Sequence, residues 1–235
     1  RQIFLVGDRP NVIGKRYGLA FSHYDLNGSL LKENLLATDS IVRPKSIIPL
    51  EDGGYYISTK TNIPDTRNSN LLLLRVNDQG DILWSKKYAN IYPKQTILTS
   101  RNELLVYGWN YSPEDEHESN EQYIKVLLLS SEGNLIWEKE LKLFNHESPE
   151  TVIETKQGKY LFSCIVDKHK LYVFRLDRQG NRSFRKPSVP VGQGSYVFLL
   201  RSRQSLIEIV KSSKKDEMGR YDLTQSEIHV IKLQE

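Results

Sequence analysis

Cysteine is almost absent from this chain of 235 residues, which contains only Cys164. An intramolecular disulfide is therefore impossible, although this leaves the cellular compartment open because many exported proteins also lack disulfides. Cys164 lies inside the apolar run Tyr160–Val166. We expect a packed thiol in the core rather than a catalytic one, since free cysteine is among the most buried residue types.

Long apolar runs and an excess of one charge are also lacking. No run approaches the roughly 20 residues that a membrane helix needs, so no transmembrane segment is predicted. Lys and Arg number 33 against 29 Asp and Glu, which leaves a net charge of only +4. Nucleic-acid binding normally requires a coherent basic face, and the basic segments 182–186 and 211–215 are interleaved with acidic ones. Neither nucleic acid nor an anionic membrane surface is therefore an expected partner.

Motifs that carry chemistry are missing as well. The chain has no Gly-x-Ser-x-Gly elbow, phosphate loop or dinucleotide fingerprint, and its acidic run 113–121 lacks the framework of a calcium loop. The histidines lack the spacing of metal ligands, which favours structural or surface roles. They are His23, His117, His146, His169 and His229. We therefore expect no enzyme activity, catalytic residue, cofactor or metal site.

A short pattern is present four times, at intervals of roughly 50 residues. Each copy joins two apolar stretches by a polar residue, two further residues and a glycine. The copies are Asp25–Gly28, Asn77–Gly80, Ser130–Gly133 and Asp177–Gly180. Glycine supplies the positive φ of a tight hairpin turn, and the polar side chain can accept hydrogen bonds from backbone N–H groups two or three residues on. Since Asp exchanges here with Asn and Ser, Asp25 and Asp177 are interpreted as turn acceptors rather than catalytic carboxylates.

An aromatic residue stands four positions after three of these glycines, at Trp84, Trp137 and Phe184, whereas the first copy has Lys32. We expect the aromatic side chains to cover the hairpin and pack on a neighbour. A second apolar–turn–apolar pattern precedes each glycine hairpin, so each unit is predicted to contain four antiparallel strands. The third strands are expected at 18–24, 71–76, 123–129, 171–176 and 227–233. Almost no helix is predicted, because no helical periodicity stands beside a cap.

Four-stranded units at this spacing predict an all-β fold, a β-propeller of antiparallel blades with about five blades visible. The expected units of this single domain are 1–40, 41–90, 91–143, 144–190 and 191–235. The first unit lacks its first strand and the fifth lacks its fourth, so either the ring closes at five blades or more chain exists at one or both ends. A sandwich or twisted barrel of similar strands is the structural alternative.

The hairpins 77–88 and 132–140 resemble the D-x-x-G-x-x-x-W blades of bacterial extracytoplasmic propeller proteins, often found in Bacteroidetes, and more distantly the pyrroloquinoline-quinone-type repeats. The Thr-Gly pair of the quinone-type repeats is absent, so no cofactor is carried over. The resemblance implies an exported, non-catalytic scaffold or binding module of a bacterial envelope. Because the chain begins at Arg1 directly in an apolar strand, a targeting segment, and with it a lipid anchor, is expected outside these residues.

Candidate binding residues come from the connections between second and third strands, which are predicted to be long loops at 8–17, 60–70, 109–122 and 211–226 and short at 167–170. Long loops often carry function, and Arg, Tyr and Trp are enriched at interface hot spots. Packing within its own loop is the alternative for Trp109. The candidate residues are Arg9, Asn11, Arg16, Tyr17, Arg67, Trp109, Tyr111, Arg220 and Tyr221.

The favoured function is a non-catalytic interaction or scaffold module, exported to the periplasm or cell surface, that binds protein partners in an envelope complex. A carbohydrate-binding lectin is one alternative, although unequal loops disfavour one sugar pocket per blade. A hydrolase or lyase with its site at the ring axis is a second alternative. An immunity protein that blocks a toxin with a broad propeller face is a third.

Overall fold

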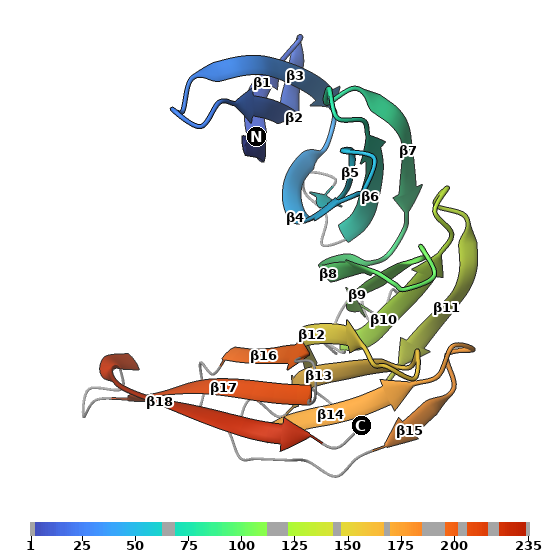
Figure 1. Ribbon diagram of the computed structural model, residues 1–235, viewed down its shortest axis with the longest axis vertical. Coiled ribbons are helices and arrows are strands. Elements are labelled where there is room, and N and C mark those ends of the chain that lie inside the picture. The colour runs from blue at the N-terminus through green and yellow to red at the C-terminus, as the bar shows by residue number, and fades with distance from the viewer. Residues whose placement is uncertain are drawn as a thin grey trace. The chain divides into compact units, whose positions relative to one another are not determined.

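The computed structural model describes the backbone of residues 3–62, 69–111, 122–142, 147–166, 170–184, 196–201, 206–215 and 221–233. It describes the side chains of residues 3–10, 13–62, 69–110, 123–142, 150–165 and 171–183. Every regular element in these ranges is a β-strand, as predicted (Figure 1). The described residues include no helix that is long and apolar enough to cross a membrane.

The chain divides into two compact units, Arg1–Thr96 and Ile97–Glu235. The first unit contains a three-stranded sheet and a four-stranded sheet, in the orders β1-β2-β3 and β4-β5-β6-β7. The strands are β1 (Ile3–Val12), β2 (Lys15–Tyr24), β3 (Leu30–Thr38), β4 (Ile41–Pro49), β5 (Tyr55–Asn62), β6 (Ser69–Val76) and β7 (Ile82–Tyr88).

Strand β8 (Tyr92–Leu98) contains the boundary between the units and is the edge strand of the third sheet, in the order β11-β10-β9-β8. The remaining sheets have the orders β12-β13-β14-β15 and β16-β17-β18. Their strands are β9 (Leu104–Tyr111), β10 (Gln122–Leu129), β11 (Leu135–Leu141), β12 (Glu147–Glu154), β13 (Tyr160–Val166), β14 (Lys170–Leu176), β15 (Arg182–Phe184), β16 (Tyr196–Arg201), β17 (Leu206–Lys215) and β18 (Tyr221–Leu233). The strands of the described residues form five antiparallel sheets, each continuous in sequence, and these are the blades of a propeller-type fold.

The glycine turns that link the third and fourth strands share one geometry. In the first, the N–H of Gly28 donates to the carbonyl of Asp25, and the N–H of Asp25 donates to the carbonyl of Ser29. This is a three-residue hairpin loop with glycine at the left-handed position, where Gly28 has a φ of +84°. The Asp25 carboxylate accepts the N–H groups of Asn27 and Ser29, each at 2.8 Å. The acceptor thus bonds two and four residues on, whereas the sequence predicted two or three.

The other glycine turns repeat these bonds, with Asn77, Ser130 and Asp177 as the acceptors. The same backbone pattern also closes the first hairpin of three sheets, at Leu50–Gly54, Thr99–Glu103 and Thr155–Lys159. One turn type therefore sets the register of seven hairpins, which explains why the sequence repeat is so visible.

Apolar side chains hold neighbouring sheets together within each unit. In the first unit, Leu19 and Phe21 of β2 join a buried cluster with Ile57 and Leu74 of the next sheet. In the second unit, Phe162 of β13 is stacked on Phe174 at 4.9 Å and meets the edge of Tyr107 from β9 at the same centroid distance. The Tyr107 hydroxyl also donates to the carbonyl of Ser163, at 3.0 Å. Cys164 is buried in this cluster, as predicted.

Of the aromatic residues after the glycines, Trp137 packs on a neighbouring sheet as expected, Trp84 packs only on its own sheet, and the side chain of Phe184 lies outside the described residues. Trp137 lies against the buried cluster of the second unit, and its indole N–H donates to the carbonyl of Arg178, in the β14–β15 turn of the next sheet, at 2.8 Å. Trp84 lies 5.9 Å from the ring of Tyr56 within its own sheet. One indole thus links two sheets, and the other covers its own.

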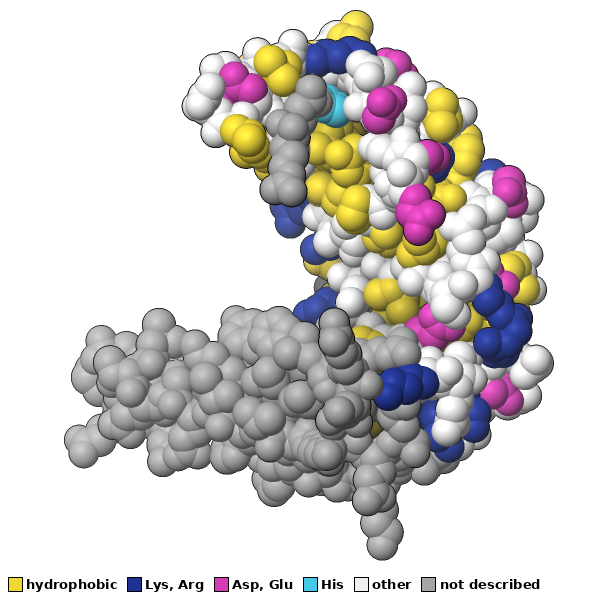
Figure 2. Space-filling model, in the orientation of Figure 1, with side chains coloured by type: hydrophobic (Ala, Val, Ile, Leu, Met, Phe, Trp, Pro, Cys, Tyr) yellow, Lys and Arg dark blue, Asp and Glu magenta, His cyan; other side chains and the backbone are white. Residues whose placement is uncertain are grey.

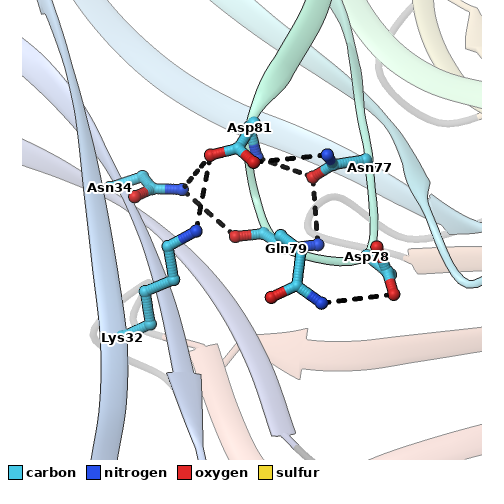
Figure 3. Close-up of polar contacts among 6 residues, drawn as sticks. All are labelled: Lys32, Asn34, Asn77, Asp78, Gln79 and Asp81. Atoms are coloured by element: carbon cyan, nitrogen blue, oxygen red, sulfur yellow. Dashed lines mark hydrogen bonds and ion pairs between the residues drawn. The ribbon is translucent and has the colours of Figure 1, made fainter.

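Polar contacts replace the indole where the first copy has Lys32 (Figure 3). The Asp81 carboxylate, in the β6–β7 turn, accepts from Lys32 Nζ at 3.4 Å and from Asn34 Nδ2 at 3.3 Å. Asn34 also donates to the carbonyl of Gln79 at 3.2 Å. A hydrogen bond from Asn77, followed by that from Lys32, keeps the pKa of Asp81 below its usual value. Strand β3 therefore contacts the β6–β7 turn of the next sheet through Lys32 and Asn34. In the second unit, Trp137 makes the corresponding contact with the β14–β15 turn.

His23 has a structural position in the first unit and makes folding stability depend on pH. Its side chain is buried, its ring centroid lies 4.8 Å from that of Phe4, and its Nε2 has no hydrogen-bond partner among the described residues. Burial, together with the charge of Lys32, lowers the pKa of His23 below its ordinary value of 6.5, while Asp78 opposes this shift. The folded chain therefore holds His23 neutral, and the unfolded chain binds more protons as the pH falls below 6.5.

We expect the contribution of His23 to the free energy of unfolding to be fully present above pH 6.5. It should be lost as the pH drops from 6.5 through the lower folded-state pKa of His23. His23→Gln, which cannot titrate, should lose this part of the pH dependence. Urea denaturation of both proteins between pH 7.5 and pH 5 measures it. Equal slopes against pH in the two proteins would show that His23 is not the titrating group.

Candidate interaction surface

The β1–β2 connection corrects the sequence analysis, which predicted a long loop over residues 8–17. The two strands instead remain paired as far as Val12 and Lys15, so only Ile13 and Gly14 form the turn. Both turn residues have positive φ, +47° and +73°. Two residues at positive φ define the type I′ turn, which matches the twist of paired strands. The predicted loop is therefore an ordered hairpin, named here the tip hairpin (residues 8–17).

The candidate residues of the tip hairpin are strand residues. Arg9 of β1 is paired with Glu33 of β3 at 2.6 Å, which ties the hairpin to the body of its sheet. The guanidinium of Arg16 lies 5.5 Å from the ring centre of its neighbour Tyr17. Lys15 is paired with Asp39 at 2.7 Å. Asn11 belongs to β1, and its side chain lies outside the described residues.

Ile13 is the feature of this hairpin that the sequence analysis missed. Its side chain is 74% exposed, the largest fraction among the exposed large hydrophobic side chains of the described residues. It is also β-branched in a left-handed conformation, where Asn or Gly is the usual residue. An apolar side chain is thus held in water, in a strained backbone conformation, with the cationic Lys15 and Arg16 next to it. The signal was weak because Val12-Ile13 continues the apolar strand pattern.

The other predicted loops are also shorter than expected, because their strands run into them. Pairing continues to Asn62 and Ser69 between β5 and β6, to Tyr111 and Gln122 between β9 and β10, and to Lys215 and Tyr221 between β17 and β18. The predicted ranges 60–70, 109–122 and 211–226 are corrected accordingly. The β5–β6 and β9–β10 hairpins lie at the end of their sheets opposite the glycine turns.

The remaining candidates lie on other sheets. Trp109 belongs to β9 and is half-buried, and Asn110 beside it donates to Glu140 of β11 at 3.3 Å. Tyr111 belongs to β9 and Tyr221 to β18, but the side chains of both lie outside the described residues. Arg67 and Arg220 lie wholly outside the described residues. Of the nine candidates, the structure therefore brings Arg9, Arg16 and Tyr17 together on one hairpin, with the backbone of Asn11. Within the described ranges, no three His, Cys, Asp or Glu residues come together in a group that could hold a metal ion.

Comparison with solved structures supports the fold. A protein of unknown function from Bacteroides caccae is similar over 88% of this chain and 79% of its own, with 15% identity and a TM-score of 0.52. An N-acetylgalactosamine deacetylase from F. plautii is similar over 97% and 88%, with 9% identity and a TM-score of 0.48. Puromycin hydrolase is similar over 93% and 44%, with 10% identity and a TM-score of 0.47. The first likeness shows the fold alone, and the other two are too distant to carry an argument.

Comparisons of the sequence find no match. No family model matches the chain, and no curated protein is similar to it. The class of the molecule is thus an all-β fold of propeller-type blades, and its function has to be argued from its own residues.

Proposed function

We propose that this chain is a non-catalytic interaction module that binds a protein partner through the tip hairpin. The observation that supports it is the exposed, strained Ile13. A left-handed conformation costs a non-glycine residue roughly 1–2 kcal/mol. An Asn at this position would lower that cost and would expose a polar side chain to water in place of an apolar one. Contact with a partner explains why an isoleucine stands here, because the apolar side chain would then be buried at an interface.

The charges around Ile13 define the partner that would fit. Lys15 and Arg16 flank the tip, and Arg9 lies further down the same hairpin. Apolar anchors surrounded by polar side chains are typical of interface centres, and Arg is enriched at hot spots. Because Arg9 and Lys15 already have Glu33 and Asp39 as ion-pair partners, the partner surface would combine an apolar pocket with a polar rim.

The resemblance to bacterial extracytoplasmic blade proteins of the D-x-x-G-x-x-x-W type suggests where the partner is found. We place the module outside the cytoplasm, in the periplasm or at the cell surface, as a scaffold subunit of an envelope complex. The glycine turns and Trp137, which form as that pattern implies, support the likeness in fold, and the placement rests on the resemblance. A lipid anchor carried by residues outside this chain fits the same placement.

Ile13→Asn separates binding from folding. We expect this variant to raise the free energy of unfolding by about 1 kcal/mol, because Asn tolerates the left-handed conformation better than Ile does. The same variant should lose its partner when it replaces the wild-type protein in affinity capture from the native cells. Urea denaturation and quantitative mass spectrometry of the captured proteins give the two readouts.

Leu26→Asn is the matched control. Leu26 is 67% exposed and lies in the glycine turn at the opposite end of the same sheet. The Leu26→Asn variant should capture the same amount of partner as the wild-type protein. Loss of the partner in both variants, or in neither, would contradict the assignment of binding to the tip hairpin.

A further inference from the structure

Three cationic side chains in the first unit, Arg43, Lys45 and Lys60, lie near Tyr92 and are named here, together with it, the basic cluster. Lys60 Nζ lies 4.0 Å from the ring centre of Tyr92, and Lys45 Nζ lies 5.0 Å from the same point. Lys45 Nζ also donates to the Tyr92 hydroxyl at 3.4 Å. Arg43 is the cross-strand partner of Lys60 in the β4–β5 ladder. Two strands of one sheet and the start of β8 thus place two ammonium groups against one aromatic ring, with a guanidinium paired across the strands from one of them.

Lys45 stands at a β-bulge of β4. Pro44 pairs with Thr59 and Ser46 pairs with Ser58, so Lys45 is the extra residue of β4 between them. Bulges change the direction of a side chain and are frequent beside functional sites. Arg43 and Lys45 are both exposed and stand two positions apart, so the strand alternation places them on the same face of β4.

Hydrogen bonds hold Tyr92 beside the bulge. The N–H of Ile91 donates to the carbonyl of Ser69 at 2.9 Å, and the N–H of Thr96 donates to the hydroxyl of Ser46 at 3.1 Å. Ile91 is fully buried. The segment 91–96, which carries Tyr92, is therefore attached to the second sheet at both of its ends. These bonds hold the Tyr92 ring in place before any ligand binds.

The positive charge of the basic cluster is not balanced within the described part of the chain. Lys15, Lys32 and Lys125 each have a carboxylate partner, but no described carboxylate forms an ion pair with Arg43, Lys45 or Lys60. Burial lowers the pKa of Lys60, and the charges of Arg43 and Lys45 lower it further, against the effect of Tyr92. On the face shown in Figure 2, the margin beside β4 and β8 has dark blue Lys and Arg side chains and no magenta ones.

We propose that the basic cluster is a binding site for a tetrahedral oxyanion, namely a phosphate or sulfate group. The two ammonium groups beside Tyr92 and the guanidinium of Arg43 can each donate charge-assisted hydrogen bonds, and three such donors match the several oxygens of a dianion better than the two of a carboxylate. The Tyr92 hydroxyl adds a neutral donor, and its ring keeps the ammonium groups in place through cation–π contact. The anion would relieve the repulsion between Arg43, Lys45 and Lys60.

Calorimetric titration with sodium phosphate tests this site, with sodium chloride adjusted to keep the ionic strength constant. Saturable binding of one phosphate per chain is expected, and sulfate should compete for it. Lys45→Gln and Lys60→Gln should each weaken the affinity by about tenfold, the effect of losing one charge-assisted hydrogen bond. Lys87→Gln, which removes an exposed lysine from β7 of the same sheet, should bind phosphate like the wild type.

A parallel titration with glucose 6-phosphate distinguishes the free ion from a group carried by a larger ligand. Binding as tight as that of inorganic phosphate, or tighter, supports a ligand that carries the group, and weaker binding supports the free ion. No saturable heat beyond that of chloride, or equal affinity in wild type and Lys45→Gln, would overturn the proposal. Ile13→Asn should leave phosphate binding unchanged, so the two proposals fail independently.

Discussion

Replacing Phe162 by alanine is expected to lower the free energy of unfolding by about 3–5 kcal/mol, the range for a buried Phe→Ala substitution. Phe162 is fully buried, stacked on Phe174 and in edge contact with Tyr107. Tyr107 belongs to β9 and Phe174 to β14, so the substitution removes contacts within one blade and between two blades. Urea denaturation measures the loss.

The cavity, rather than the change of residue, accounts for most of this loss. Phe162→Leu keeps an apolar side chain that fills much of the space but loses the two ring contacts, and it should cost clearly less than Phe162→Ala. A loss below about 1 kcal/mol in Phe162→Ala would mean that β9 and β13 are not packed face to face as described.

Replacing Gly54 by alanine is expected to cost about 1–3 kcal/mol, the usual range for overpacking a buried site. A Cβ at this position would lie 2.5 Å from the carbonyl oxygen of Val76, which is backbone and cannot move aside cheaply. It would also meet the guanidinium of Arg75. That guanidinium is bonded to the Val76 carbonyl and to the Asp52 carboxylate and lies over the ring of Tyr56.

Gly7→Ala is the control for the general effect of a glycine substitution. Gly7 lies in β1 with an ordinary φ, and a Cβ there would meet nothing within 4 Å. Since alanine also restricts the unfolded chain, this variant should be neutral or slightly stabilising. The midpoint temperatures of thermal unfolding of the two variants should therefore shift in opposite directions from the wild type, or differ from each other by several degrees. Equal midpoints would contradict the close approach of Arg75 to the β4–β5 turn.

The fold was predictable from sequence because its turns are chemically uniform. Gly28, Gly80, Gly133 and Gly180 all take the positive φ that the repeat implied. The predicted third strands end where β2, β6, β10, β14 and β18 end, at residues 24, 76, 129, 176 and 233. Turn geometry depends on neighbouring residues only, so a single sequence is enough to show it.

The tip hairpin was not predictable because two local rules are broken there. Pro10 and Asn11 are typical of loops, but β1 is an edge strand of its sheet, where proline is tolerated. Ile13 occupies a left-handed position that its side chain disfavours. The same limit applies to the basic cluster, because the bulge at Lys45 and the position of Tyr92 arise from pairing and tertiary contacts.

Site-specific photo-crosslinking in the native cells tests the central claim most directly. A photoreactive phenylalanine analogue, benzoyl-phenylalanine, would be placed at position 13 in one protein and at position 26 in another. The proposed function predicts one predominant protein adduct from position 13 and none from position 26, since only the tip hairpin contacts the partner. An absence of protein adducts at position 13, or the same adducts from both positions, would contradict binding through the tip hairpin.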